Sequence, residues 1–425
     1  MSEDTVFALA SGAGRAAIAV IRISGPDSAA VLTALCGSLP FPRRAAVRAL
    51  HDTNGELLDR AMVLWMPGPA SYTGEDSAEL HVHAGRAVID GVAEALVSLG
   101  LRPAEPGEFT RRAFLNGKMD LVSAEAVHDL VAAETDAQRR QALRQLDGAL
   151  GDLYRDWSDR LRGALARQEA LIDFPDEDLP PEVEADLLAS VRSLRYEIET
   201  HLDDRHRGEK LREGLCFAIT GAPNVGKSSL INALAERDVA IVSATPGTTR
   251  DAIETRVVLG GVPVTLVDTA GLRDTRDPVE AEGVRRARAR AASADLVVTV
   301  IEAGSAFTPG GLTVANKSDL WPEQRPGVVP VSALTGAGLS GLRTRLAAEA
   351  TTLTQSSGPP PLTRVRHRTA LLTAARWLGD SETASEPELR GEAMRLALRA
   401  LGSITGQVGV EDILDSIFRQ FCIGK

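Results

Sequence analysis

An eight-residue segment, Gly221-Ala-Pro-Asn-Val-Gly226-Lys227-Ser228, limits the fold of this chain more than any other part of the sequence. It matches the pattern G-x-x-x-x-G-K-[ST] and lies between an apolar run at 216–220 and a helical pattern at 228–235. Backbone N–H groups of such a loop and of the following helix converge on a phosphate. We therefore predict a nucleotide-binding α/β domain in which Lys227 contacts the β- and γ-phosphates and the Ser228 hydroxyl binds Mg²⁺.

Three further segments follow in the order of a guanine-nucleotide site. Asp268-Thr269-Ala270-Gly271 ends an apolar run, so its carboxylate can hold Mg²⁺ through water and its glycine N–H can meet the γ-phosphate. In Asn316-Lys317-Ser318-Asp319, the Asp319 carboxylate can accept both N–H groups of a guanine edge, which adenine does not offer. Ser332-Ala333-Leu334 supplies a backbone N–H for guanine O6. Together the four segments predict a GTP-binding domain.

The segment Gly247-Thr248-Thr249-Arg250-Asp251 predicts a switch, in which the hydroxyl of Thr249 closes on Mg²⁺ and senses the γ-phosphate. Many GTPases place Gln directly after the glycine at 271 to orient the attacking water. This chain has Leu272 there, which cannot hydrogen-bond water, so hydrolysis needs another group. The nearby charged residues are candidates for orienting the water, although each of them is better explained as a solvated surface charge. They are Arg273, Asp274, Asp277, Glu280 and Glu282.

Composition excludes several classes of protein. With 425 residues and 44% hydrophobic content, the chain is long enough for several cores and too apolar to be mainly disordered. A net charge of −11 argues against a protein that wraps nucleic acid with its whole surface. Cys36, Cys216 and Cys422 are too few and too scattered for a disulfide framework or a zinc site. We expect no signal peptide, no membrane span and a cytoplasmic location.

The composition and the hydrophobic periodicity of the sequence change at three places, and these changes divide the chain into four segments. Residues 1–118 read as mixed α/β, 119–212 as polar helices, 213–350 as strands alternating with helices, and 351–425 as helices after a linker rich in Thr, Ser, Gly and Pro. Neither helical part looks like a complete bundle. We therefore predict a multidomain α/β and α protein: an N-terminal α+β domain, a discontinuous helical domain, and an inserted Ras-like P-loop GTPase domain with a parallel sheet.

Four stretches make the chain resemble one family, the tRNA-modification GTPases MnmE (also TrmE). They are residues 4–25, residues 71–134, the GTPase motifs and the C-terminal Phe421-Cys422-Ile423-Gly424-Lys425, an ending that other GTPases do not carry. The resemblance covers essentially the whole chain. It implies that residues 1–118 form a tetrahydrofolate-binding domain that mediates a constitutive homodimer.

The resemblance also implies an activity and its partners. Members act with the FAD protein MnmG, in a heterotetramer, on the wobble uridine of certain tRNAs. They install an aminomethyl or carboxymethylaminomethyl group at carbon 5, with a one-carbon unit from a tetrahydrofolate derivative (5,10-methylene- or 5-formyl-tetrahydrofolate). GTP hydrolysis depends on Mg²⁺ and K⁺ and drives dimerisation of the GTPase domains.

The family pattern assigns roles to individual residues. Asn224 matches the K⁺ ligand, and Ser243, Thr245 and Thr248 complete the shell of that ion, whose charge offsets the charge that develops during hydrolysis. Glu280 matches the catalytic glutamate, which orients water through a bridging water.

Ser228 and Thr249 bind Mg²⁺, and the folate site contains Arg22, Glu79, Lys118 and Lys425. The residues that contact GTP lie in the four motifs and the switch: Asn224, Val225, Gly226, Lys227, Ser228, Ser229, Ser243, Ala244, Thr245, Pro246, Gly247, Thr248, Thr249, Asp268, Thr269, Ala270, Gly271, Asn316, Lys317, Ser318, Asp319, Ser332, Ala333 and Leu334.

Several weaker signals have two readings each. Cys422 is either a buried apolar thiol or a reactive thiol near folate or substrate. His81 and His83 alternate on a predicted strand, where ordinary polarity explains them better than a metal pair. Three basic clusters are better explained as solvated helix faces than as tRNA contacts: Arg139, Arg140 and Arg144; Arg285, Arg286, Arg288 and Arg290; Arg364, Arg366, His367 and Arg368.

Two other functions were weighed against this one. A ribosome-assembly GTPase would explain neither the N-terminal domain nor the Cys-Ile-Gly-Lys ending, and it would call for a basic RNA-binding module. A folate transferase with an inactive GTPase domain conflicts with the complete set of GTP motifs. One departure from the family concerns the GTPase domain: the segment between Ile301 and Asn316 is shorter than usual, which puts the geometry of GTPase-domain pairing in question.

Overall fold

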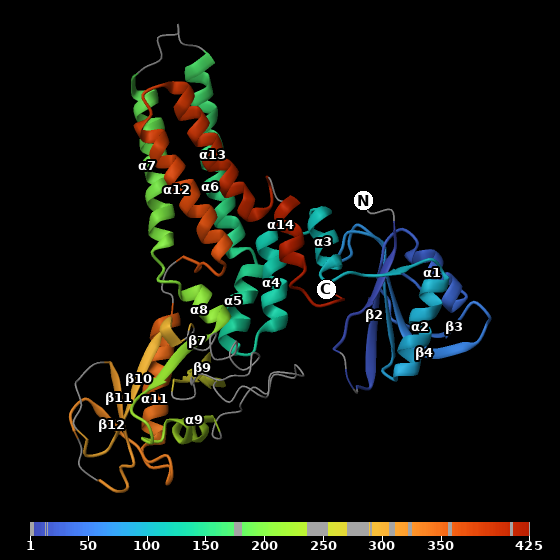
Figure 1. Cartoon of the computed structure of the whole chain (residues 1–425). Coiled ribbons are helices and arrows are strands. Elements are labelled where there is room, and N and C mark those ends of the chain that lie inside the picture. The colour runs from blue at the N-terminus through green and yellow to red at the C-terminus, as the bar shows by residue number, and fades with distance from the viewer. Residues whose placement is uncertain are drawn as a thin grey trace, which may run out of the picture. The chain divides into compact units, whose positions relative to one another are not determined.

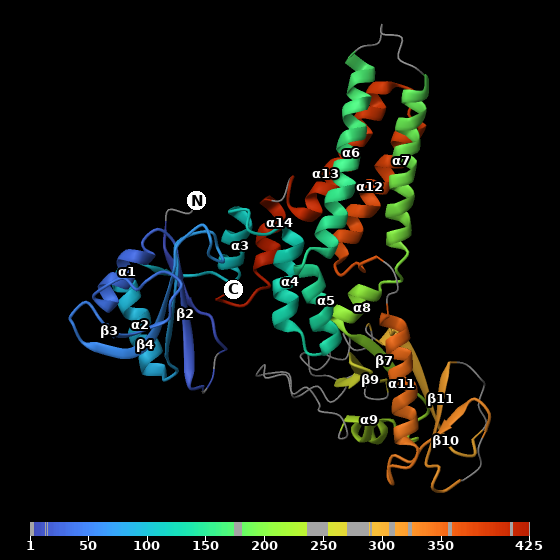
Figure 2. The ribbon, with the colours of Figure 1, turned by 180° about the vertical axis from the view of Figure 1, so that it is seen from behind.

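The computed structural model describes residues 4–12, 14, 16–173, 181–235, 254–269, 289, 291–305, 311–321, 325–355, 359–408 and 411–424. Its contacts divide the chain into two compact units. The first comprises Met1–His128, Leu146–Arg160 and Leu398–Lys425, and the second comprises Asp129–Gln145 and Leu161–Ala397. Figures 1 and 2 show the chain from opposite sides.

The first unit is built on a six-stranded sheet with the order β3-β4-β5-β2-β1-β6. Neighbouring strands are antiparallel except for the short parallel pair of β1 with β6. The strands are β1 (Val6–Leu9), β2 (Ile18–Ser24), β3 (Ala46–His51), β4 (Leu57–Met66), β5 (Ser77–His83) and β6 (Arg102–Pro103). The helices beside them are α1 (Ser28–Cys36), α2 (Arg86–Ser98) and α3 (Glu108–Leu115). This mixture confirms the predicted α+β class.

The two faces of this sheet have different neighbours, because side chains alternate along each strand. On one face, Phe7 joins a buried apolar cluster with residues of α1 and α2. On the other face, Ala8 packs with Phe109 of α3. Ala8 is the register partner of Arg22, and Arg22 is the register partner of Glu79. Two of the predicted folate residues therefore lie on the second face.

The first unit also contains a small apolar cluster formed by residues far apart in the sequence. It joins α4 (Leu121–Ala132) to α14 (Glu411–Phe418) and the residues just after it. Its buried members are Leu121, Ala124, Leu414, Ile417, Phe418 and Phe421. The C-terminal segment is therefore anchored by apolar packing up to the residue that precedes Cys422.

Helices that precede and follow the second sheet in the sequence pack together, and they belong to the second unit wholly or in part. They are α5 (Asp136–Leu146), α6 (Ala149–Asp173), α7 (Pro181–Leu202), α8 (Arg207–Glu213), α12 (Val365–Thr383) and α13 (Pro387–Thr405). Helix α7 contacts α12, and Gln168 Nε2 of α6 donates a hydrogen bond to the Pro387 carbonyl of α13 (2.9 Å). Figures 1 and 2 both show these four helices side by side. The discontinuous helical layer agrees with the predicted fold class.

The second sheet has the strand order β12-β11-β10-β7-β9-β8. Its strands are β7 (Leu215–Thr220), β8 (Glu254–Leu259), β9 (Val262–Asp268), β10 (Leu296–Glu302), β11 (Leu312–Asn316) and β12 (Val328–Pro330). Helices α9 (Lys227–Ala235) and α11 (Leu339–Thr354) pack against it and share its apolar core. All pairs are parallel except β8 with β9.

The antiparallel edge of this sheet is explained by a two-residue turn. Gly260 and Gly261 link β8 to β9 and both have positive φ, of 62° and 79°. Such a turn matches the twist of a β-hairpin and forces the two strands to run in opposite directions. Strands β3 and β6 were not predicted from the sequence, and the other boundaries moved by a few residues. Within the described part of the chain, every helix is too short or too polar to cross a bilayer.

Candidate functional site

The glycines of the segment 221–228 are required by close contacts with neighbouring strands. A Cβ on Gly221, whose φ is +143°, would lie 2.1 Å from the Val300 carbonyl oxygen of β10. A Cβ on Gly226, whose φ is +90°, would lie 2.3 Å from Asn316 Nδ2 of β11. Asn224 has a φ of +62°, a conformation that Asn adopts more readily than most residues. Neighbouring strands therefore fix the backbone of this loop at the carboxyl edge of the sheet.

Lys227, Ser228 and Asp268 lie where β7, α9 and β9 meet. Lys227 is 4% exposed, and its Nζ donates hydrogen bonds to the carbonyls of Gly221 (2.9 Å) and Ala222 (2.8 Å). The Ser228 hydroxyl donates to Asp268 Oδ2 (2.5 Å). A hydroxyl beside a carboxylate is an oxygen donor pair of the kind that Mg²⁺ prefers, so these residues fit that ion.

Asn316 joins the phosphate loop to the last of the four segments, 332–334. Its Nδ2 donates to the Val225 carbonyl (2.8 Å), and its Oδ1 accepts from the Ala333 N–H (3.0 Å). Asn316 is 3% exposed and Ser332 is fully buried. One buried amide thus fixes the distance between the loop at 221–228 and the segment at 332–334.

The remaining GTP residues that the structure describes lie around this junction. Asp319, Ser229 and Leu334 are exposed, whereas Val225 is buried. The Thr269 hydroxyl donates to the Ile219 carbonyl, and the Ser318 N–H donates to the Val331 carbonyl. Several predicted residues lie outside the described part of the chain: Ser243, Ala244, Thr245, Pro246, Gly247, Thr248, Thr249, Ala270, Gly271, Glu280 and Lys425, together with the candidates Arg273, Asp274, Asp277 and Glu282.

The second candidate site is on the face of the first sheet that carries Arg22 and Glu79. The Arg22 guanidinium donates from Nε and Nη2 to Glu79 Oε1, at 3.2 and 3.0 Å. Its Cζ lies 5.3 Å from the ring centre of Tyr72 and 5.7 Å from that of Phe109. His81 Nε2 lies 3.2 Å from Glu79 Oε2. The site therefore combines a planar cation, a carboxylate and two aromatic rings.

Tyr72 belongs to this site through its burial as well as its ring. Its hydroxyl is 2.9 Å from the Thr110 hydroxyl of α3. Burial raises the pKa of Tyr72, and the Thr110 hydrogen bond and the Arg22 charge oppose that shift. The phenol is thus a neutral hydrogen-bonding group at neutral pH. Neither Tyr72 nor Phe109 was singled out from the sequence, because their partners are distant along the chain.

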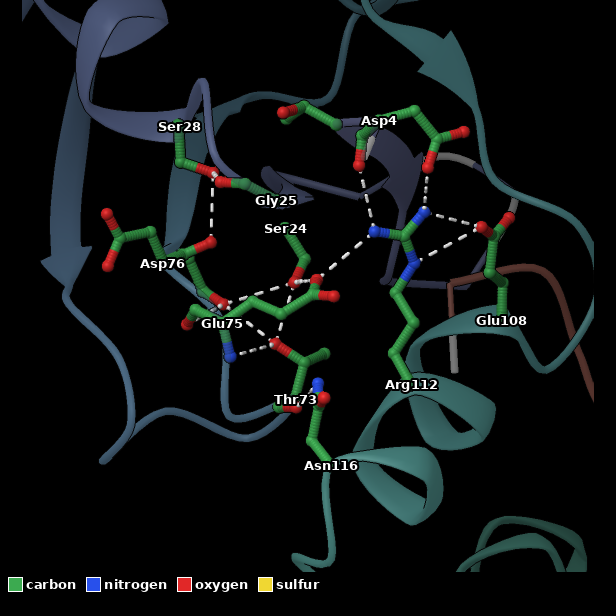
Figure 3. Close-up of polar contacts among 12 residues, drawn as sticks. Asp4, Ser24, Gly25, Ser28, Thr73, Glu75, Asp76, Glu108, Arg112 and Asn116 are labelled. Atoms are coloured by element: carbon green, nitrogen blue, oxygen red, sulfur yellow. Dashed lines mark hydrogen bonds and ion pairs between the residues drawn. The ribbon is translucent and has the colours of Figure 1, made fainter. Parts of the chain in front are cut away.

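Arg112 of α3 holds the loop at 67–76, which carries Tyr72, against the sheet (Figure 3). Its Nη1 donates to Glu75 Oε2 (3.1 Å) and to the Asp4 carbonyl (3.0 Å), and its Nη2 donates to Glu108 Oε1 (2.8 Å). Ser24 at the end of β2 donates its hydroxyl to the same Glu75 oxygen (2.8 Å). One buried guanidinium thus connects the chain start, the loop and α3.

The electrostatics of Glu108 reflect this arrangement. Burial alone would raise the pKa of its carboxyl, but hydrogen bonds from Arg102, from the Glu105 N–H and from Arg112 outweigh burial and lower it.

A second contact holds the loop 67–76 at the other end of α3. There, Asn116 Nδ2 donates a hydrogen bond to the Thr73 carbonyl (2.8 Å).

The other two predicted folate residues have different positions. Lys118 Nζ donates to the Pro69 carbonyl (3.0 Å), and its aliphatic stem packs against Gly74, so it contacts the loop that carries Tyr72. Lys425 lies outside the described residues, but Gly424 is buried beside the end of β1. A Cβ on Gly424, whose φ is +95°, would lie 2.4 Å from the Leu9 carbonyl oxygen. Cys422 is exposed, which removes the reading of a buried thiol.

The weaker signals have ordinary structural explanations. Arg139 and Arg140 form ion pairs with Asp136 on the exposed surface of α5. Arg368 is largely buried and bridges Asp204 and Glu209, so it is not a solvated residue as predicted. His83 pairs with Asp59, and the described residues contain no cluster of three or more metal-ligating side chains.

Comparisons with known proteins agree with this geometry. A family described as the MnmE helical domain matches residues 121–422, and one described as the GTP-binding protein TrmE N-terminus matches residues 5–118. The chain is 58% identical over 440 residues to a tRNA modification GTPase MnmE of Granulibacter bethesdensis, covering 100% of both chains. It is 59% identical over 428 residues to one of Gluconacetobacter diazotrophicus, covering 99% of this chain and 98% of the relative.

Proposed function

Because the chain belongs to the MnmE family of tRNA modification GTPases, we propose that it couples potassium-dependent GTP hydrolysis to a modification at carbon 5 of the wobble uridine of certain tRNAs. With the FAD protein MnmG it adds an aminomethyl or carboxymethylaminomethyl group, and a tetrahydrofolate derivative supplies the one-carbon unit. The working form is a homodimer that joins MnmG in a heterotetramer in the cytoplasm. We assign the N-terminal folate-binding domain to residues 1–118, the helical domain to 119–212 and 351–425, and the GTPase domain to 213–350.

The GTP half of the proposal is carried by the meeting of four motifs at one edge of the second sheet. Asn316 contacts the loop at 221–228 and Ala333 at once, and the Ser228 hydroxyl contacts Asp268. On GTP binding, Lys227 exchanges its two carbonyl partners for phosphate oxygens. Ser228 and Thr249 hold Mg²⁺, and the Asp319 carboxylate accepts the two N–H groups of guanine.

Hydrolysis needs an oriented water and compensation of developing charge. Glu280 orients the water through a second water, since Leu272 cannot. K⁺ bound by Asn224, Ser243, Thr245 and Thr248 offsets the charge on the phosphates. Asn224 is exposed and its backbone has a positive φ, so its side chain is accessible to an ion, which supports this role.

The folate half of the proposal is carried by the Arg22–Glu79 pair between two aromatic rings. The flat pteridine ring of a folate has an edge of alternating donors and acceptors and two faces for stacking, and its glutamate tail is anionic. Glu79 suits the donors of the edge, the half-buried ring of Tyr72 suits a face, and Lys118 and Lys425 suit the carboxylates.

The first test is the rate of GTP hydrolysis by the full chain in KCl and in NaCl at equal ionic strength. We expect a large stimulation by K⁺ alone, and we expect Asn224→Ala to abolish the difference while GDP still binds. Equal rates in the two salts would contradict the potassium site. Glu280→Ala should bind GTP but hydrolyse it at least about a hundredfold more slowly; the neighbouring Glu282→Ala is its matched control.

The folate proposal has a separate test. Titration of 5-formyl-tetrahydrofolate into the full chain should show saturable binding, which Glu79→Gln weakens by about tenfold or more through loss of a charged acceptor. GTP hydrolysis by Glu79→Gln should be unchanged. Binding that is equally tight in this variant would contradict the assignment of Glu79.

A further inference from the structure

The connection between β10 and β11 is too short for an ordinary crossover. These two strands are parallel neighbours, and nine residues, 303–311, lie between the end of β10 and the start of β11. Parallel neighbours need a connection of about a dozen residues or more, which is usually a helix. A connection of nine residues is shorter than that.

The described start of this connection packs under an aromatic ring. Gly304 has a φ of +89°, and a Cβ placed on it would lie 3.2 Å from Trp321 Cδ2 and 3.3 Å from Trp321 Cε2. Because glycine has no Cβ, the indole ring can lie directly against the backbone. Arg325 adds hydrogen bonds from its guanidinium to the carbonyls of Ser305 (2.5 Å) and Gly304 (3.2 Å). Trp321 and Arg325 thus hold the first residues of the connection, Gly304 and Ser305, in place.

Trp321 lies two residues after Asp319 and ends a turn, 317–321, that includes most of the segment proposed to recognise guanine. That segment is a turn, in which the Leu320 N–H bonds to the Lys317 carbonyl (3.0 Å) and the Trp321 N–H bonds to the Ser318 carbonyl (3.3 Å). Lys317 has a φ of +63°, an unfavourable conformation for a residue with a side chain, so the turn needs external support.

The support comes from both ends of the turn. At its start, Lys317 Nζ pairs with Glu302 Oε1 at the end of β10 (2.9 Å). At its end, the Trp321 ring covers Gly304. The exposed Asp319 lies between these two attachments in the sequence.

We propose that Trp321 is a positioning residue for guanine recognition, which holds the turn 317–321 on the short β10–β11 connection and so directs the Asp319 carboxylate. This inference rests on the proposed GTP site. It adds to that site one contact, the Trp321 ring against Gly304.

The test is the Kd of the full chain for GDP, measured by calorimetry, together with kcat and KM for GTP. Trp321→Ala should weaken GDP binding roughly three- to tenfold, because a half-exposed aromatic contact is lost. KM should rise by a similar factor, whereas kcat and the melting temperature should stay near those of the wild type. Trp321→Phe should restore most of the affinity, and Trp377→Ala, which removes a partly exposed indole from α12, should have no effect.

A double-mutant cycle locates the effect in the contact itself. Gly304→Ala places a methyl group against the ring, so it should also weaken GDP binding, and its effect should be smaller when residue 321 is already Ala. Asp319→Ala serves as the reference for the guanine site. If Asp319→Ala weakens binding and Trp321→Ala does not, or if Trp321→Ala lowers kcat and melting temperature with the Kd unchanged, the inference is wrong. If Asp319→Ala leaves the Kd unchanged, it is the proposed guanine site that fails.

Discussion

At the scale of single residues, selectivity for guanine depends on the hydrogen-bonding character of one exposed side chain. Asp319 offers acceptors only, which match the two N–H groups on the guanine edge. Asn at the same position offers a donor and an acceptor, which match a base that has a carbonyl in place of the guanine amino group.

Asp319→Asn should therefore exchange the base preference. We expect GDP affinity to fall by about 10- to 100-fold through loss of the charged acceptor, and affinity for xanthosine diphosphate to rise. Calorimetric Kd values for the two nucleotides check this prediction. An equal loss for both would mean that residue 319 supports the loop and does not read the base.

Single residues also show how far sequence reasoning could go. The motif glycines were predictable because Gly221 and Gly226 belong to a pattern whose spacing is fixed by the phosphate. Arg112 was not predictable, because its partners Asp4 and Glu75 lie 108 and 37 positions away and become neighbours only in the folded chain. For the same reason the sequence named Arg22 and Glu79 only through resemblance, without indicating that they pair.

At the scale of elements, the loop 67–76 gains its order from side chains rather than from its own backbone pattern. Arg112 is 4% exposed and shares its hydrogen bonds among Asp4, Glu75 and Glu108. Removal of Arg112 leaves the buried Glu75 carboxylate without its ion-pair partner, whereas Glu108 and Asp4 keep Arg102. Loss of one partner of a buried ion pair costs about 3–5 kcal/mol.

Arg112→Met should lower the melting temperature of the N-terminal part and weaken binding of 5-formyl-tetrahydrofolate, because Tyr72 loses its support. Arg112→Lys should recover part of both. The matched control is Arg86→Met, the same change at an exposed pair on α2. GDP binding should be unaffected in all three variants. Unchanged folate binding in Arg112→Met, with a lowered melting temperature, would show that the network stabilises the fold without shaping the site.

The packing of α7 on α12 should make stability sensitive to acid through one histidine. His201 is 6% exposed, and its pKa is lowered to about 4, first by burial and further by the charges of Arg368 and His367, against the opposing effect of Asp204. Its unfolded pKa is about 6.5. A depressed folded pKa means that the neutral form is favoured in the fold, so the contribution is complete above about pH 6.5 and falls as the pH drops toward 4.

At pH 5 the loss from His201 should be about 2 kcal/mol. Melting curves of the wild type and of His201→Gln between pH 7.5 and 5 measure it: the variant should lose less stability over this range, whatever its stability at pH 7.5. His83→Gln, at an exposed site, should keep the wild-type pH dependence. Parallel curves for the wild type and His201→Gln would contradict the prediction.

Turns between elements can also carry a local sequence signal. The dipeptide Gly260-Gly261 between two apolar runs is a hairpin signal, and it would have identified the antiparallel edge of an otherwise parallel sheet. Strand β6 has two residues, and among the described strands it pairs with β1 alone. Because its formation depends on a neighbour 96 positions earlier, no local sequence pattern predicts it.

At the scale of the whole molecule, the sequence predicts that one domain is inserted into another, because neither helical segment alone makes a complete bundle. The contacts between the two points where the chain leaves and re-enters the helices, here called the crossing, show how such an insertion is built. Where the chain leaves the helices and where it returns, the two segments are in contact: the Asp204 carboxylate accepts from the Leu362 N–H (3.2 Å), and a Cβ on Gly208 would lie 2.2 Å from the Leu362 carbonyl oxygen. Arg368 fastens the same crossing through Asp204 and Glu209. Adjacent chain ends of this kind are what an independently folding insert requires.

The inserted segment should therefore fold by itself. The buried members of its apolar core lie between Leu215 and Ala350, and among the described residues the neighbours from outside that range that pack on it are Leu211 of α8 and Leu353 of α11. A fragment of residues 207–356, which includes α8, should melt cooperatively and bind GDP within a few-fold of the full chain. It should bind no 5-formyl-tetrahydrofolate.

The complementary chain, in which a short Gly-Ser linker replaces residues 215–356, should have the opposite properties. Since Arg368, Asp204 and Glu209 remain, the crossing stays closed and the helical layer keeps its contacts. This chain should bind 5-formyl-tetrahydrofolate like the full chain and bind no GDP; calorimetry with both ligands on both chains measures the exchange. If the fragment 207–356 is unfolded while the full chain is folded, the sheet depends for its stability on the helices around it. Nucleotide binding and folate binding then cannot be separated by cutting the chain at this crossing.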